Sequence, residues 1–270
     1  MNFDTLFKTN VVFTLWCTDN NLLTETIPAA IWQLPNMSEI YLFNNQLSGS
    51  ISTPVVSPAI DAGPWLQFVD IANNLLTGFI PESLFNSRWS NVQYFYAYNN
   101  QFTGSIPRSI GNLTGAVILD LSDNSELSGS MPIEIFTKCL SLEEISITGT
   151  SLTGSIPNEI MNLRLLQYLY LDNNELVGSI PAALWQMPSL ENLYLDRNKL
   201  SGSITVRPAS EKYPIPLLTV FLSLNNLTGS IPEELFSERW SNVQAFLASG
   251  NRFVGSIPNT TPLGNKFHNP

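Results

Sequence analysis

The chain has 270 residues, of which 44% are hydrophobic and only 13% are charged, and its formal net charge is −10. This apolar content excludes an intrinsically disordered chain, and the acidic balance argues against nucleic-acid binding, which needs a basic surface. The single histidine, His268, is the third residue from the end, which argues against Ser-His-Asp catalysis, Cys-His catalysis and histidine-rich metal sites.

From residue 13 to about residue 258 the chain repeats a motif that ends in Gly-Ser-Ile-Pro or a close variant. Glu25 occupies the glycine position in the first copy, and the glycines of the later copies are Gly49, Gly78, Gly104, Gly129, Gly154, Gly178, Gly202, Gly229 and Gly255. Steps of 24 to 29 residues separate these positions, which gives ten copies. A repeat of this length predicts a solenoid.

Each copy carries two apolar positions separated by one residue, as in Leu169, Tyr170 and Leu171. This spacing places both apolar side chains on one face of a short strand and the intervening side chain on the other face. One copy cannot bury its apolar row alone, so we expect the copies to stack and their strands to form a parallel sheet.

An asparagine follows three residues after the second apolar position in every copy except one, where Thr150 stands. Its amide can satisfy backbone N–H and C=O groups of the turn that would otherwise be buried without partners. The glycine suits a tight backbone position, and the proline, which lacks an N–H, ends the local hydrogen-bond ladder.

The motif L-x-x-L-x-L-x-x-N-x-L-[ST]-G-x-I-P resembles the plant-type leucine-rich repeat, with a close match in LQYLYLDNNELVGSIP at 166–181. The resemblance covers essentially the whole chain. It implies a right-handed α/β-type superhelix, mostly β with 3-10 turns, in which a parallel sheet lines the concave face. It also implies the extracellular part of a receptor-like kinase or receptor-like protein, which is membrane-associated in full length and senses peptides, hormones or microbial molecules.

We expect one leucine-rich repeat domain over residues 1–270, with Pro-rich insertions at 52–65 and 205–216 that leave the solenoid as loops. IPAAIWQLP at 27–35 returns as IPAALWQMP at 180–188, which indicates a duplicated block. Trp32, Trp89, Trp185 and Trp240 fall in matching places of the two halves, where we expect packing behind the strands. Neither end carries the paired-cysteine cap of related ectodomains, so we expect a fragment.

The two cysteines, Cys17 and Cys139, lie five copies apart. At about 4.8 Å per strand they are separated by about 24 Å, whereas the Cα atoms of a disulfide lie within about 7 Å. We therefore expect two free thiols, with Cys17 exposed on the first strand in the column of Tyr41.

The outward positions of the strands and the positions that follow them predict an aromatic surface with acidic groups on the concave face. The candidate ligand-binding residues are Tyr41, Phe43, Asp70, Tyr96, Tyr98, Asp120, Tyr170, Asp172, Tyr194, Asp196 and Phe221. Exposed aromatic side chains give a large contact area at a small entropic cost, which suits a protein, peptide or glycan ligand. The alternative is that these aromatic residues only stabilise neighbouring strands.

No enzymatic activity is expected. Asp172 and Asp196 are about 5 Å apart in adjacent copies, near the separation of a retaining glycosidase pair, but an open, wet face does little to raise the pKa of one carboxylate. There is no kinase signature in this chain, and no cofactor or metal site is expected.

Two surface features have weaker sequence signals. Sequons occur at Asn36, Asn112, Asn226 and Asn259 and are candidate glycosylation sites of an extracellular protein. A ladder of Ser and Thr beside the repeat glycine would suit ice or a polymer lattice, although local bonding of these hydroxyls to the turn backbone explains it more simply.

The sequence thus predicts recognition of a ligand on the concave face, in receptor-like signalling or defence, with a possible co-receptor. One alternative is a secreted inhibitor of a polysaccharide-degrading enzyme, and another is a structural, adhesion or ice-binding surface protein. We expect an extracellular or cell-surface location, no nucleic-acid partner and no membrane contact by this segment. The sequence contains neither a recognisable signal peptide nor a stretch of about 20 apolar residues.

Overall fold

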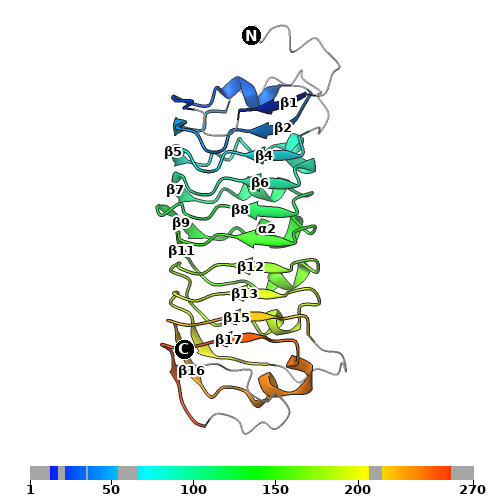
Figure 1. Ribbon diagram of the computed structural model, residues 1–270, viewed down its shortest axis with the longest axis vertical. Helices are drawn as coiled ribbons and strands as arrows, with labels where there is room; N and C mark the ends of the chain where they lie inside the picture. The colour runs from blue at the N-terminus through cyan, green and yellow to red at the C-terminus, as the bar shows by residue number, and fades with distance from the viewer. Residues whose placement is uncertain (1–12, 18–21, 35, 54–65, 207–214, 257–270) are drawn as a thin grey trace.

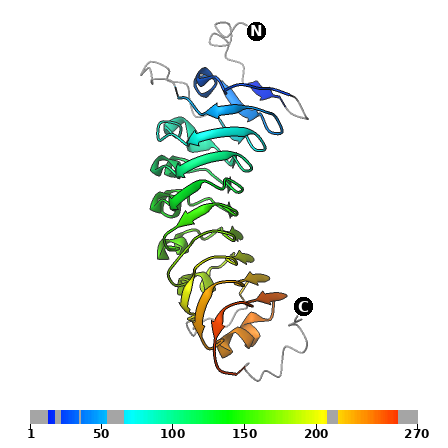
Figure 2. The ribbon, with the colours of Figure 1, turned by 90° about the vertical axis from the view of Figure 1, so that its left-hand side faces the viewer.

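The computed structural model describes residues 13–17, 22–34, 36–53, 66–206 and 215–256. Over these residues the chain winds into a curved stack of coils, with one coil for each sequence repeat (Figure 1). A continuous parallel sheet lies on the inner side of the curve and short helices lie on its outer side (Figure 2). The predicted solenoid with a parallel sheet on its concave face is confirmed.

The inner sheet contains ten strands, one from each repeat. In sheet order they are β1 (Phe13–Trp16), β2 (Met37–Tyr41), β4 (Phe68–Asp70), β6 (Tyr94–Tyr96), β8 (Ile118–Asp120), β10 (Glu144–Ser146), β12 (Tyr168–Tyr170), β13 (Asn192–Tyr194), β15 (Thr219–Phe221) and β17 (Ala245–Leu247). Leu169 pairs with Ile145 on one side and Leu193 on the other, and all three side chains are fully buried. Each coil therefore covers the apolar row of the next.

Two smaller parallel sheets run along one edge of the stack, formed by the segments around the repeat glycine. The first contains β3 (Ser48–Ser50), β5 (Leu75–Phe79), β7 (Gln101–Ser105), β9 (Leu127–Ser130) and β11 (Ser151–Thr153), and the second contains β14 (Ser201–Ser203), β16 (Asn226–Gly229) and β18 (Arg252–Phe253). A Cβ on Gly154 would lie 2.9 Å from the Cβ of Ser130 in the preceding coil, and its φ is +77°. Glycine is needed here because a Cβ would clash with Ser130 and because other residues are strained at this positive φ.

Short helices connect the smaller sheets to the next strand of the inner sheet. They are η1 (Ala29–Gln33), η2 (Ser87–Asn91), η3 (Arg108–Asn112), α2 (Ile133–Lys138), η4 (Asn158–Asn162), η5 (Ala182–Gln186), η6 (Glu233–Phe236) and η7 (Glu238–Trp240). Proline is the N-cap residue of most of them, as Pro132 is for α2, because its missing N–H would have no intrahelical acceptor at this position. None of these helices is long and apolar enough to cross a membrane.

The repeat asparagines form a ladder under the turns that follow the inner strands. Asn100 donates through Nδ2 to the carbonyls of Ile71, Ala97 and Tyr98 at 3.0–3.3 Å and accepts the Leu76 N–H through Oδ1 at 3.1 Å. The same pattern recurs at Asn74, Asn124, Asn174, Asn198 and Asn225. The predicted role of the asparagine in satisfying the buried turn backbone is confirmed.

The four tryptophans of the duplicated block pack into the core behind the strands, as predicted. Trp89, Trp185 and Trp240 are at most 2% exposed, and Trp32 is 7% exposed. The two insertions themselves, 52–65 and 205–216, lie mostly outside the described residues.

The first repeat differs from the prediction by one residue of register. A bulge between Phe13 and Thr14 makes Trp16, and not Cys17, the neighbour of Tyr41. The Cys17 side chain consequently packs against the core and is partly buried, so its expected exposure was wrong. Cys17 and Cys139 are both free thiols, as expected.

Candidate functional site

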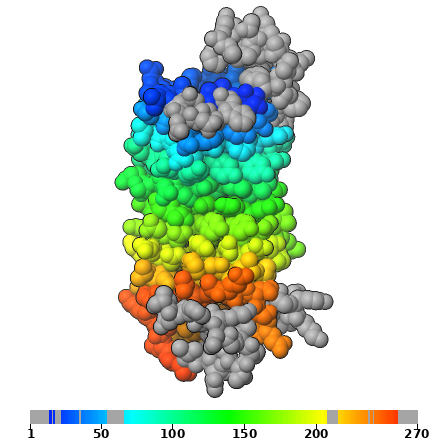
Figure 3. Space-filling model, viewed as in Figure 1, coloured from blue at the N-terminus to red at the C-terminus, as the bar shows by residue number. Residues whose placement is uncertain are grey.

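The concave face of the inner sheet brings most of the predicted binding residues into one row. Strand pairing places them in the order Tyr41, Asp70, Tyr96, Asp120, Ser146, Tyr170, Tyr194, Phe221 and Leu247. All of these side chains except that of Ser146 are partly exposed, and Ser146 is 9% exposed. This is the face turned toward the reader in Figure 3.

The first part of the row is an N-terminal aromatic cluster formed by Tyr41, Phe68, Tyr94, Tyr96 and Tyr98. The Tyr41 and Phe68 rings stack at 4.5 Å, and Phe68 contacts the rings of Tyr94 and Tyr96, each at 5.7 Å. Phe68 was missed in the sequence because it follows directly on the first insertion. Its position two residues before Asp70, in the column of Tyr94, is the signal that identifies it.

A C-terminal aromatic cluster, formed by Tyr168, Tyr170, Tyr194 and Phe221, lies farther along the same face. Tyr194 stacks on Phe221 at 4.4 Å with an interplanar angle of 20°, and Tyr170 meets Tyr194 edge-on at 5.0 Å. Such ring pairs are worth about 0.5–1.5 kcal/mol beyond their burial, so they also stabilise the sheet. The structure therefore shows that these rings contact one another across neighbouring strands, as the alternative interpretation expects. It also shows that the same rings remain partly exposed.

Three carboxyl groups surround Tyr96 on the concave face. Burial raises the pKa of Asp70 to about 6, and it also raises the pKa values of Asp120 and Glu144. Burial and the charges of these three groups raise the pKa of Tyr96 to about 12. An open face was expected to do little to raise the pKa of one carboxylate, but the neighbouring strands and rings remove water from these groups and raise their pKa values.

The inner strands carry acidic residues and no basic ones. Glu39, Asp70, Asp120 and Glu144 lie within the ten strands, whereas Lys, Arg and His are absent from them. The ion pairs among the described residues, Lys199 with Glu175 and Arg197 with Asp196, lie outside these strands. The field of the concave face is therefore acidic.

Two strands with short polar side chains separate the aromatic clusters. The Ser122 N–H donates to Asp120 Oδ1 at 2.9 Å, and the hydroxyls of Ser122 and Ser146 lie 2.8 Å apart. The Thr148 N–H donates to Ser122 Oγ at 3.1 Å. These bonds fix the Asp120 carboxylate in place before any ligand binds.

The remaining predicted residues lie at the ends of the strands. Asp172 accepts a hydrogen bond from Thr148 Oγ1 at 2.8 Å, and burial raises the pKa of Asp172, while Asp196 lies 3.9 Å from Arg197. Phe43 is partly exposed in the turn after β2. No three His, Cys, Asp or Glu side chains in the described part of the chain are placed to hold a metal ion.

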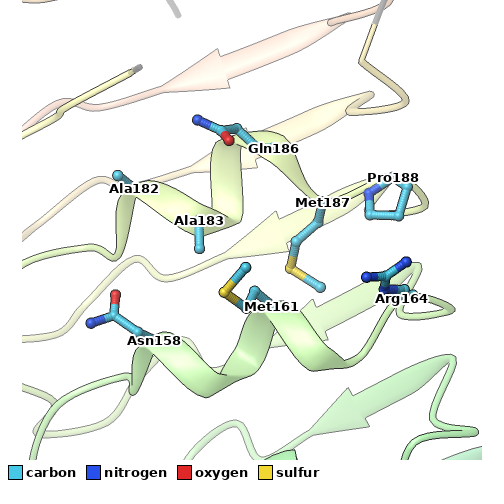
Figure 4. A pocket seen from close by; sticks show the side chains of 8 residues that line it. All are labelled: Asn158, Met161, Arg164, Ala182, Ala183, Gln186, Met187 and Pro188. Carbon is cyan, nitrogen blue, oxygen red and sulfur yellow. The ribbon is translucent and has the colours of Figure 1, made fainter. Parts of the chain in front are cut away.

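A hollow on the outer side lies between η4 and η5 (Figure 4). Its volume is about 590 Å³, and it is lined by Asn158, Met161, Arg164, Ala182, Ala183, Gln186, Met187 and Pro188. Ala182 and Ala183 line it at positions where most corresponding helices carry larger residues. Figure 4 shows the side chains of Met161, Ala183 and Met187 converging on it. The sequence prediction did not include this hollow.

The predicted glycosylation sites are only partly covered by the structure. Asn36, Asn112 and Asn226 are partly exposed, and Asn112 Nδ2 donates to the Phe85 carbonyl at 2.8 Å. Asn259 lies outside the described residues. These asparagines remain predicted sites.

The hydroxyl ladder follows the smaller sheets and is interrupted by apolar side chains. Phe79, Val177 and Val254 stand in its columns and are 43–68% exposed. Within the ladder, the Ser128 hydroxyl donates to the Gly104 carbonyl at 3.4 Å. Local bonding therefore accounts for this hydroxyl.

Family models named "Leucine rich repeat" match residues 141–200, 65–87 and 91–113. Among curated proteins of Arabidopsis thaliana, Receptor-like protein 7 is 37% identical over 115 residues, and Receptor-like protein 6 is 32% identical over 150 residues. These alignments include 42% and 54% of this chain but only 11% and 14% of the relatives. The chain therefore spans a small part of their length.

Solved plant structures share the fold. One is the ectodomain of the Arabidopsis thaliana receptor kinase GASSHO1/SCHENGEN3 in complex with CASPARIAN STRIP INTEGRITY FACTOR 2. Its TM-score is 0.72 at 32% sequence identity, and the alignment covers 85% of this chain and 26% of the ectodomain chain. Another is the Arabidopsis receptor kinase HAESA in complex with the peptide hormone IDA and the co-receptor SERK1. Its TM-score is 0.73 at 28% sequence identity, and the alignment covers 87% of this chain and 37% of the HAESA chain. A plant ice-binding protein, at 23% identity and a TM-score of 0.70, shares the fold alone.

The repeat motif, the asparagine ladder and these similarities agree. The chain has a leucine-rich repeat fold and is similar to plant receptor-like proteins and to the ectodomains of plant receptor kinases.

Proposed function

We propose that the concave face of the inner sheet recognises a peptide ligand as part of a plant receptor-like ectodomain. The observation that carries this proposal is the row of partly exposed aromatic and acidic side chains across β2 to β15. Rigid aromatic rings supply contact area at a low entropic cost, and fixed carboxylates supply orientation. No chemical step is required for such a role.

The solved neighbours support a peptide as the ligand class. HAESA was solved in complex with the peptide hormone IDA and the co-receptor SERK1, and GASSHO1/SCHENGEN3 in complex with CASPARIAN STRIP INTEGRITY FACTOR 2. By this likeness the proposed role lies at the cell surface, in signalling or defence, together with a co-receptor.

The test is a selection of random twelve-residue peptides on the immobilised chain. The selected peptides are then measured against a Tyr96→Ser, Tyr170→Ser and Tyr194→Ser triple variant and against Phe79→Ser. Phe79 is an exposed aromatic residue of β5, away from the concave face, and therefore controls for loss of a ring in general.

We expect the triple variant to lose binding by a factor of about ten or more, since three central contacts are removed, and Phe79→Ser to retain it. Thermal unfolding of both variants checks that the solenoid is intact. Peptides that bind the triple variant as tightly as the unchanged chain would refute the concave face as the recognition surface.

A further inference from the structure

The concave row has a defined break between its two aromatic clusters. Along the row, Tyr96 of β6 is followed by Asp120 of β8, Ser146 of β10 and Tyr170 of β12. Asp120 and Ser146 are short, whereas the tyrosines on either side are long. A ligand that contacts both clusters must therefore cross two strands whose central side chains are small and polar.

The groups that such a ligand would meet there are carboxylates without a cation. Glu144 lies on β10, the strand next to that of Asp120, where it pairs with Ile118 and is diagonal to Asp120, whose charge acts on it. No ion pair joins either carboxylate to a described residue. The three serine and threonine contacts described above hold Asp120 in place but supply no charge. Burial raises the pKa of both carboxyl groups, which shows that the surrounding protein stabilises their charged forms poorly.

Charge complementarity selects the class of partner. A positively charged side chain would gain two charge-assisted hydrogen bonds, and the faces of the flanking tyrosine rings also attract cations. An anionic group, such as a free carboxyl end, would meet only like charges on these strands. Metal ions are disfavoured because the described carboxylates are not grouped to share one.

The spacing of the clusters fixes the length of the ligand. Three strand steps separate β6 from β12, which is about 14 Å at about 4.8 Å per step. In an extended peptide, residues i and i+4 are about 13 Å apart, and residues i, i+2 and i+4 face the same side. A residue at i+2 therefore lies over β8 and β10 when residues i and i+4 lie over the two clusters.

We propose that the concave face takes an extended peptide with one basic side chain, whose charged head binds Asp120 and Glu144. Apolar side chains two positions before and two positions after it pack on the N-terminal and C-terminal aromatic clusters. This inference rests on the proposed function and adds the charge and the spacing of its ligand.

The test uses two synthetic peptides that differ only in charge. The first is acetyl-Gly-Phe-Gly-Arg-Gly-Phe-Gly-amide, and the second has citrulline, an uncharged isostere, in place of arginine. Their dissociation constants for the 270-residue chain are measured by isothermal titration calorimetry at low salt. We expect the arginine peptide to bind about tenfold more tightly, because a hydrogen bond to a charged group exceeds a neutral one.

An Asp120→Asn and Glu144→Gln double variant should reduce this ratio to about one, since both changes keep the shape and remove the charge. Glu39→Gln is the matched control, because Glu39 occupies the same column as Glu144 but on β2, where it accepts a hydrogen bond from Thr14. The control should keep the full ratio.

Equal binding of both peptides, or a ratio that survives in the double variant, would overturn the inference. If both peptides bind equally and Tyr170→Ser abolishes binding, recognition by the concave face stands and only the cation site fails. Failure of both peptides to bind at millimolar concentration also overturns the cation site, while the peptide selection decides the proposed function independently.

Discussion

The indole rings of Trp185 and Trp240 lie 5.9 Å apart across the coil that carries the second insertion. Trp185 belongs to η5, before β13, and Trp240 to η7, after β15, and the connection from β13 to β15 contains no helix among its described residues. Trp32 and Trp89 repeat this relationship at 5.9 Å around the first insertion. In both halves, tryptophans from the flanking coils meet across a coil whose described residues contain no helix.

This pairing predicts a large, local loss of stability when either ring is removed. Trp240→Ala should lower the free energy of unfolding by about 3–5 kcal/mol, as truncation of a buried tryptophan leaves a cavity. Equilibrium denaturation in urea measures the change. In a double-mutant cycle with Trp185→Ala we expect a coupling of about 0.5–3 kcal/mol, as for residues in contact. Strict additivity would show that the two rings do not support one another.

The asparagine ladder predicts opposite effects for two reciprocal substitutions. Thr150 stands where the other repeats have the asparagine, and it donates to Asn174 Oδ1. The Leu121 carbonyl therefore accepts a side-chain amide hydrogen bond from Asn124 and none from the next repeat. Thr150→Asn should supply a second donor to that carbonyl and stabilise the chain by about 1 kcal/mol. Asn124→Thr should destabilise it by about 3 kcal/mol, because it leaves buried backbone groups without partners. Chemical denaturation of both variants tests the pair, and destabilisation by Thr150→Asn would contradict it.

The fold was predictable from sequence because nearly every repeat has the same apolar positions to bury and the same turn residues. The two apolar columns, the asparagine and the glycine recur in register, so the pairing of Tyr170 with Tyr194 follows from alignment alone. The first strand was misplaced by one residue because its copy has Thr18 in an apolar column and Glu25 in place of the glycine that fixes register elsewhere. A bulge at Phe13 cannot be read from a single degenerate copy.

The candidate site was predictable in its position but not in its energetics. Column position identifies which side chains point outward, whereas the pKa of Asp70 depends on how much water the neighbouring rings exclude. Phe68 illustrates the same limit, since its partner Tyr41 lies on the other side of the first insertion in the sequence. The hollow between η4 and η5 is lined by residues of two successive coils, so it depends on which side chains meet in space.

The raised pKa of Asp70 predicts a dependence of stability on pH. Its value is about 6 in the folded chain and 3.8 in the unfolded reference, so the folded state binds more protons between these values. Stability should therefore fall as pH rises from about 4 to about 6 through this group. Asp70→Asn removes the effect and should be more stable than the unchanged chain by about 1 kcal/mol at pH 7, after allowance for solvent screening.

The measurement is thermal unfolding of both proteins between pH 3.5 and pH 7.5. The stability difference between them should be small below about pH 4 and should reach its full size above about pH 6. Asn keeps an oxygen acceptor for the Ala72 N–H that Asp70 Oδ1 accepts at 3.0 Å, so the local turn is retained. A difference that is constant over the whole range would contradict the raised pKa.

The contact between coils at the repeat glycine predicts a substitution that is rescued by its neighbour. Gly154→Ala adds a Cβ 2.9 Å from the Cβ of Ser130 and also places alanine at a φ of +77°. The backbone conformation alone costs about 1–2 kcal/mol for a residue other than glycine, and the contact adds to it. Ser130→Gly removes the opposing Cβ, so in that background Gly154→Ala should cost only the conformational part. Urea denaturation of the four chains of this cycle separates the two contributions, and an equal cost of Gly154→Ala in both backgrounds would show that packing between these coils plays no part.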